Sequence, residues 1–152
     1  MALVGKLHPL LLHFPIGLIL AAAAAELVAI HTGRADWRAI AATNVRAGAA
    51  MGALTALAGW GLASSDLVEP SRLLAWHGWI GAAGALGAIG AALLSIGAHD
   101  RTRGRRVAYR AALFGAAALV AVAGHLGGTL VWSADAAGLD LTDLVSFVRE
   151  SR

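Results

Sequence analysis

The chain has 152 residues, of which 59% are hydrophobic and 14% charged, and it contains 19 glycines and no cysteine. A water-soluble domain of this length needs more polar cover, so the composition predicts an integral membrane protein. The lack of cysteine excludes disulfides, thiolate metal sites and covalently attached c-type haem. The formal charge of +3 comes from arginines between apolar blocks, where it indicates membrane topology and not nucleic-acid binding.

Four apolar blocks follow one another along the chain, each near or above the ~20 residues needed to cross about 30 Å of hydrocarbon. They run over residues 8–30, 44–63, 73–97 and 107–132. Backbone polar groups inside a bilayer must pair within their own segment, so each block is predicted to be a helix. We therefore expect an all-α fold, an antiparallel bundle of four transmembrane helices within residues 1–133, followed by a tail over 134–152.

The segments between these blocks are polar and short. A loop over 31–38 is expected after the first helix, and the turn 64–71 ends in Pro70 and Ser71, which suit a helix N-terminus. The segment 98–106 is the most basic part of the chain. In the tail, the apolar residues 141, 144, 145 and 148 have helical spacing on one face, which predicts a short amphipathic helix in the membrane interface.

The distribution of charge predicts the orientation. One side of the bundle carries eight arginines, at positions 34, 38, 46, 101, 103, 105, 106 and 110. The other side has four basic residues set against six acidic ones: Lys6, Arg72, Arg149 and Arg152 against Asp66, Glu69, Asp135, Asp140, Asp143 and Glu150. The positive-inside rule places the arginine-rich side in the cytoplasm. Both termini and the turn 64–71 then face the periplasm of a bacterial inner membrane.

Histidines cluster near the predicted outer side. At ~1.5 Å per residue, His13, His77 and His125 each lie roughly 7–12 Å below the outer boundary, and His8 lies at that boundary. Ionisable groups inside a membrane are costly and usually functional, so three helices that bring imidazoles to one depth predict a ligand site. His8 ranks last, because a shallow interfacial histidine needs no special explanation.

Two further polar features lie at the predicted inner side. His31 and His99 fall at helix C-termini, where a protonated imidazole meets the negative end of the helix dipole; a second ligand pair is the less favoured alternative. Glu26 is expected to pair with Arg46 or another inner arginine, in preference to acting as a proton-relay carboxylate.

The outer cluster lacks carboxylates and thiolates, and imidazole alone serves zinc, copper and haem iron. A zinc hydrolase would want a carboxylate base beside the metal. Gly124 and Gly128 flank His125, and Trp76 precedes His77; such glycines let a porphyrin approach the backbone, and the indole can pack against its edge. We therefore expect a bis-histidine haem b, one or two per chain. The iron ligand candidates are His13, His77 and His125, with His8, Gly124, Gly128 and Trp76 as further cofactor contacts.

Axial pairing is expected from the order of the helices. The first and third helices are diagonal in a cyclic four-helix bundle, which favours His13 with His77, and His125 is the close competitor. The expected function is electron transfer within a larger redox complex, with quinone as one candidate partner. No catalytic residue is identified. Copper or zinc binding or transport, and a cofactor-free structural subunit, stay open as alternatives.

Three motifs carry a resemblance to a known family. They are Leu7-His-Pro-Leu-Leu-Leu-His-Phe-Pro15, Trp76-His-Gly-Trp-Ile-Gly81 and Gly124-His-Leu-Gly-Gly-Thr-Leu130. Together they resemble a bacterial four-helix membrane domain of unknown function, over residues 7 to 132. Members of that family often accompany periplasmic c-type cytochrome modules. The resemblance therefore implies electron transfer to a membrane or periplasmic redox protein such as a c-type cytochrome. No such module follows in the tail here, so that partner would be a separate chain.

Overall fold

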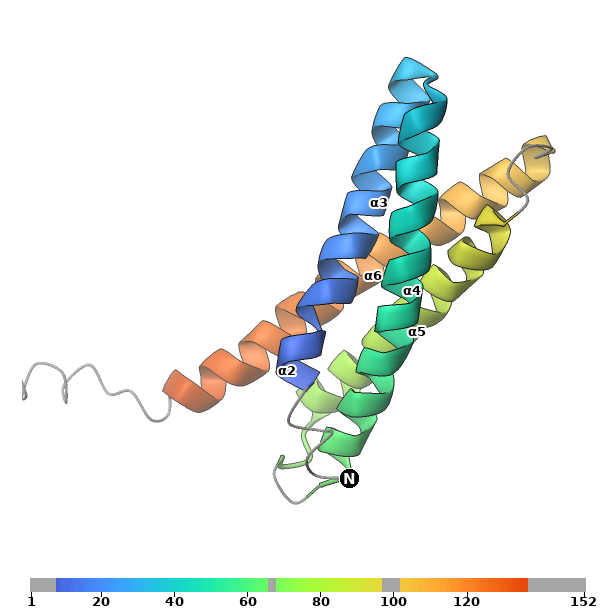
Figure 1. Ribbon diagram of the computed structural model, residues 1–152. Coiled ribbons are helices and arrows are strands. Elements are labelled where there is room, and N and C mark those ends of the chain that lie inside the picture. Colours follow the sequence, from blue (N-terminus) through green and yellow to red (C-terminus); the bar gives the residue numbers. More distant parts are fainter. Residues whose placement is uncertain (1–7, 66–67, 97–101, 137–152) are drawn as a thin grey trace, which may run out of the picture.

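A computed structural model describes residues 8–65, 68–96 and 102–136, and within them the chain is entirely helical apart from turns (Figure 1). Four long helices pack as a bundle, preceded by a single short turn of helix. In chain order the elements are α2 (His8–Leu11), α3 (His13–Thr32), α4 (Ala35–Ala63), α5 (Arg72–Ser95) and α6 (Arg103–Ala136). The all-α four-helix bundle expected from the sequence is confirmed. The predicted amphipathic tail helix and His99 lie outside the described residues.

One residue, Leu12, separates α2 from α3. Proline at position 15 has no N–H to donate, and its ring clashes with the carbonyl four residues earlier, that of Leu11. The regular helix is interrupted at that point, at Leu12, and resumes at His13. Leu12 nevertheless keeps helical dihedral angles, with φ −61° and ψ −27°.

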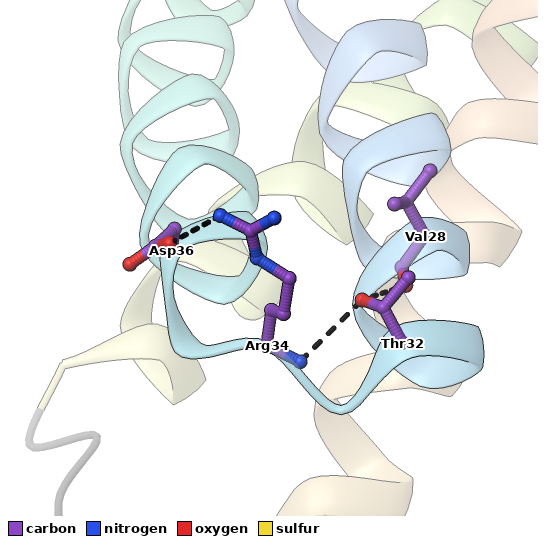
Figure 2. A network of polar contacts seen from close by, with 4 residues as sticks. All are labelled: Val28, Thr32, Arg34 and Asp36. Carbon is purple, nitrogen blue, oxygen red and sulfur yellow. Dashed lines mark hydrogen bonds and ion pairs between the residues drawn. The ribbon is translucent and has the colours of Figure 1, made fainter.

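The turn between α3 and α4 is shorter than the sequence predicted. Gly33 ends α3 with φ at +69°, the left-handed conformation that favours glycine, and α4 already begins at Ala35. Figure 2 shows the polar contacts that close the turn: Arg34 donates to Asp36 at 2.9 Å and its backbone N–H donates to the Thr32 hydroxyl at 3.4 Å. The predicted loop over 31–38 is thus largely helical, and α4 starts well before the predicted position 44.

The start of α5 agrees with prediction. Ser71 caps the helix, and its Oγ accepts a hydrogen bond from the Leu74 N–H at 3.1 Å, which satisfies one of the backbone donors left free in a first helical turn. The helix begins at Arg72, directly after the Pro70-Ser71 pair.

The bundle consists of two hairpins in cyclic order. We call residues 8–63 (α2, α3 and α4) the first hairpin and residues 72–136 (α5 and α6) the second hairpin. Within each, the two long helices lie side by side (Figure 1), and the hairpins meet through α4 against α5 and α3 against α6. The end that holds α2, the end of α4 and the start of α5 is called the histidine end. The opposite one, with the end of α3 and the start of α6, is called the arginine end.

The core is built largely from small side chains, as in other membrane bundles where helices approach closely. Its largest fully buried residues are Ile19, Val45, Tyr109 and Leu113, surrounded by alanines. Gly48 lies against α3, where an added Cβ would come 2.8 Å from Ile19 Cγ1, and Gly84 lies against α6, 3.0 Å from Val120 Cγ2. The glycine spacing seen in the sequence therefore serves helix packing at these positions.

Three stretches are long and apolar enough to cross a membrane, namely His8–Thr32, Arg72–Ser95 and Arg103–Trp132, which identifies a multi-pass membrane protein. The predicted second span, 44–63, is not among them, because α4 is rich in glycine and alanine where it packs and carries Arg46. The helix nevertheless runs antiparallel between α3 and α5, and the side that it turns outward is apolar, with Leu57 72% exposed. That surface suits contact with lipid.

Candidate functional site

His8 reaches from α2 to the backbone of α4. Its Nδ1 lies 3.0 Å from the Thr55 carbonyl oxygen, and the imidazole is half-buried. The ring lies over Gly59, where an added Cβ would come 2.7 Å from His8 Cε1. Glycine at this position therefore makes the space that the imidazole occupies.

His77 makes the same contacts in the second hairpin. Its Nδ1 lies 2.9 Å from the Ala123 carbonyl oxygen on α6, and the ring lies over Gly127, where an added Cβ would come 2.9 Å from His77 Cε1. In both cases the glycine follows the accepting residue by one helical turn.

The two imidazoles meet between the hairpins. Their ring centroids are 6.2 Å apart and the ring planes are nearly perpendicular, at 83°. A carbonyl oxygen can only accept a hydrogen bond, so Nδ1 of each ring carries the proton and Nε2 of the neutral ring holds a free lone pair. Metal-binding histidines usually have this arrangement, with the non-ligating nitrogen donating to a carbonyl that orients the ring.

The spacing of the pair also suits a shared metal ion. Imidazole nitrogens bind metals at about 2.0–2.1 Å, and a ring centre lies roughly 1.1 Å behind its nitrogen. Two imidazoles on opposite sides of one ion therefore have centres roughly 6 Å apart, close to the 6.2 Å observed. In the described parts of the chain no three side chains among His, Cys, Asp and Glu come together as metal ligands, so the described residues of this site provide two imidazoles.

The other predicted ligands stand apart from this contact. His13 is exposed, and its Nδ1 bonds to the Pro9 carbonyl oxygen at 2.9 Å within its own segment. His125 is also exposed. The structure thus places His8 against His77, where sequence reasoning favoured His13. The proposed glycine contacts differ as well: a Cβ on Gly124 would meet Ile16 at 3.4 Å, and Gly128 faces open space.

Aromatic side chains border the histidine end. Trp60 of α4 and Trp79 of α5 contact each other edge to face, with centroids 5.9 Å apart, and so join the two hairpins beside the histidines. Trp76, predicted to pack against a cofactor edge, is 62% exposed. Its exposure fits the interfacial aromatic belt expected at this level of the membrane.

Sequence reasoning missed the residues that orient the imidazoles. Gly59 and Gly127 were not singled out, because glycine is frequent throughout these helices. The Thr55 and Ala123 carbonyls carry no side-chain signature at all. One signal was present: each glycine stands on a helix that faces a histidine on its hairpin partner at the same end of the bundle.

At the arginine end, two sets of polar side-chain contacts connect the two hairpins. Glu26 on α3 is buried, 3% exposed, and accepts from Arg110 Nε on α6 at 2.8 Å, which confirms the expected pairing with an inner arginine. Arg46 on α4 instead donates to Ser95 on α5, to the hydroxyl and to the carbonyl oxygen, each at 2.7 Å. These contacts hold the hairpins together far from the histidine pair.

Comparisons with known proteins identify a membrane protein family and assign no function to it. No curated protein and no solved structure matches the chain. A family model described as predicted membrane protein (DUF2231) matches residues 5–137, which include all the described helices. The chain therefore belongs to the DUF2231 family of predicted membrane proteins.

Proposed function

We propose that the protein is a membrane-bound electron-transfer subunit of the b-type cytochrome kind, with His8 and His77 as the two axial ligands of one haem b. The observation that supports this most is the pair itself: two imidazoles at 6.2 Å, each with Nδ1 bonded to a backbone carbonyl. This donor set fits haem iron, which neutral imidazole nitrogen binds well.

The residues of the chain hold and orient the site. The Thr55 and Ala123 carbonyls fix which nitrogen of each ring is free, and they increase the basicity of that nitrogen. The surrounding helices bury both imidazoles in part, and burial of a site is one of the protein's means of setting a redox potential. Haem b, when bound, would supply one-electron transfer.

The orientation predicted from the arginines would place the histidine end at the periplasmic face of a bacterial inner membrane. A haem near that face suits exchange of electrons with a membrane or periplasmic redox protein, such as a c-type cytochrome, or with quinone in the bilayer. These 152 residues contain no cysteine for a covalently attached haem, so the proposal requires a further redox centre as electron donor or acceptor.

Copper is the second candidate, and a specific observation favours it. Two neutral imidazoles without a third protein ligand in the described parts of the chain suit copper, for which imidazole is a common ligand. Zinc is less well served, because its protein sites usually have three or four protein ligands.

The experiment is to purify the protein from membranes of cells supplied with haem precursor, iron and copper, and to measure haem, iron and copper per chain. The proposal predicts about one haem b per chain and no bound copper. Stoichiometric copper without haem would select the copper-binding alternative. Protein that contains neither would contradict both and support a structural subunit.

A further inference from the structure

The two hairpins share one pattern of burial along their helices. Positions of α3 and α5 correspond at a constant separation, that of His8 and His77 (77 − 8 = 69 residues), and four of the seven buried positions of α3 fall on buried positions of α5. The pairs are Pro15 with Gly84, Ile19 with Ala88, Ala22 with Ala91 and Glu26 with Ser95. The two residues of each pair are of different types or, in one pair, both alanine, so the two helices correspond in which positions are buried and not in sequence.

The second helices of the hairpins correspond in the same way. The separation here is that of Gly59 and Gly127 (127 − 59 = 68 residues), and six of the eight buried positions of α4 match buried positions of α6. The pairs are Ala41 with Tyr109, Val45 with Leu113, Gly48 with Ala116, Ala49 with Ala117, Gly52 with Val120 and Thr55 with Ala123.

Contacts within the hairpins follow this correspondence. In the first hairpin Gly48 lies against Leu18, 3.2 Å from its Cβ to an added Cβ. The equivalent positions of the second hairpin are Gly87 and Ala116, with a separation of 3.3 Å measured in the same way. The small residue is on α4 in one hairpin and on α5 in the other, yet the two helices of each hairpin approach at the same place.

The histidine contacts correspond at the same separations of 69 and 68 residues. His8 bonds to Thr55 and lies over Gly59, and the equivalent His77 bonds to Ala123 and lies over Gly127. In the cyclic order, exchanging α3 with α5 and α4 with α6 leaves every helix contact in place. Together, the matching burial and the matching histidine contacts point to a two-fold pseudo-axis that runs along the bundle between the hairpins, where the two imidazoles contact each other.

We infer that the bundle is an internal structural duplication whose two halves contribute equally to one ligand site on the pseudo-axis, and that Gly59 and Gly127 are its equivalent positioning residues. The ligand part of this inference rests on the proposed function; the positioning part does not. Each glycine leaves room for its imidazole beside the accepting carbonyl, because a methyl group there would come within 2.7 Å of Cε1 of His8 or 2.9 Å of Cε1 of His77.

The test compares Gly59→Ala and Gly127→Ala with Gly61→Ala and Gly115→Ala, two glycines that face open space on the same helices. The first readout needs no metal: the ¹⁵N resonances of the imidazoles in the cofactor-free protein. Gly59→Ala should abolish the Nδ1-protonated state of His8 and spare His77, and Gly127→Ala should do the reverse. The two control variants should leave both rings unchanged.

The second readout is the affinity for added hemin or Cu(I). Each positioning variant should weaken binding by a similar factor, roughly 10- to 100-fold, as expected for the loss of a group that orients a ligand. Unequal losses, or no loss in either variant of a protein that binds the ligand, would overturn the inference and leave the proposed function intact. If the wild-type protein binds neither ligand but each variant still displaces only its own imidazole, the proposed function fails and the positioning role stands.

A double variant keeps the test decisive if a glycine substitution impairs folding. His8→Ala with Gly59→Ala lacks the ring that the new methyl would strike, so its melting temperature should equal that of His8→Ala alone. A melting temperature that Gly59→Ala lowers equally in both backgrounds would assign Gly59 to general helix packing and overturn its positioning role.

Discussion

The histidines near one end of the bundle have different surroundings even though the sequence places them at similar depth. The neighbour of His77 is His8 and not the favoured His13. Depth along ideal helices could not reveal this, because depth does not determine which side of its helix a side chain occupies. The decisive contacts are also made to backbone carbonyls, which every residue has.

Substitution of the four histidines should divide them into two classes. His8→Ala and His77→Ala each remove one of two ligands and should lose most of the bound haem, whereas His13→Ala and His125→Ala should retain it, since those rings are exposed and lie outside the pair. Haem per chain, measured on purified protein, gives the answer. Loss of haem in His13→Ala with retention in His8→Ala would restore the pairing favoured by sequence.

At the scale of elements, the sequence predicted the number and kind of helices and the start of α5 at Pro70-Ser71. It failed at the start of α4, where Asp36 and Arg38 suggest a loop but lie in the first turns of the helix. The physical reason is that Gly33 completes the reversal of the chain almost alone, and Arg38 Nη2 donates to the Gly33 carbonyl oxygen at 2.7 Å. Charged residues in a first helical turn are compatible with a helix that ends in the interface.

Packing inside the first hairpin depends on the small size of Gly48. Gly48→Ala places a methyl group within 2.8 Å of Ile19 Cγ1 and 3.3 Å of the Ile19 backbone nitrogen, and overpacking of this kind costs about 1–3 kcal/mol. The melting temperature in detergent should fall. Gly90→Ala is the control, because an added Cβ there meets nothing and alanine favours helix by about 1 kcal/mol over glycine. If the melting temperature of Gly48→Ala equalled that of Gly90→Ala, the close packing of α4 against α3 at Gly48 would be refuted.

The link between Glu26 and Arg110 should behave as a coupled pair. Glu26→Gln leaves the partly buried guanidinium without its carboxylate, and we expect a loss of about 1–3 kcal/mol, less than for a fully buried pair because Arg110 is 30% exposed. The double variant with Arg110→Gln should recover part of that stability. Unfolding of the single and double variants measures the coupling, and strictly additive losses would show that the two residues act independently.

At the scale of the molecule, two equivalent hairpins are joined by polar links at the arginine end and by the histidine and tryptophan contacts at the histidine end. The fold class followed from composition and from the length of the apolar blocks. The duplication could not be predicted in that way, because corresponding positions share burial and contacts but few residue types. The evidence for the duplication is the match between buried positions of the two hairpins.

The orientation of the bundle in the membrane can be tested directly because the chain has no cysteine of its own. A single cysteine in place of Ser64, at the histidine end, should react with a membrane-impermeant maleimide in intact spheroplasts. A cysteine in place of Thr32, at the arginine end, should react only after lysis. The opposite labelling pattern would place the histidine pair on the cytoplasmic side.

The central claim is that His8 and His77 bind one haem iron together, and the coordination state of that iron tests it most directly. Visible and electron paramagnetic resonance spectra of the purified ferric protein should show six-coordinate, low-spin haem, because two imidazoles complete the coordination. Residual haem in His8→Ala or His77→Ala should be high-spin. A high-spin wild-type spectrum, or a low-spin spectrum that survives the loss of either histidine, would contradict the claim.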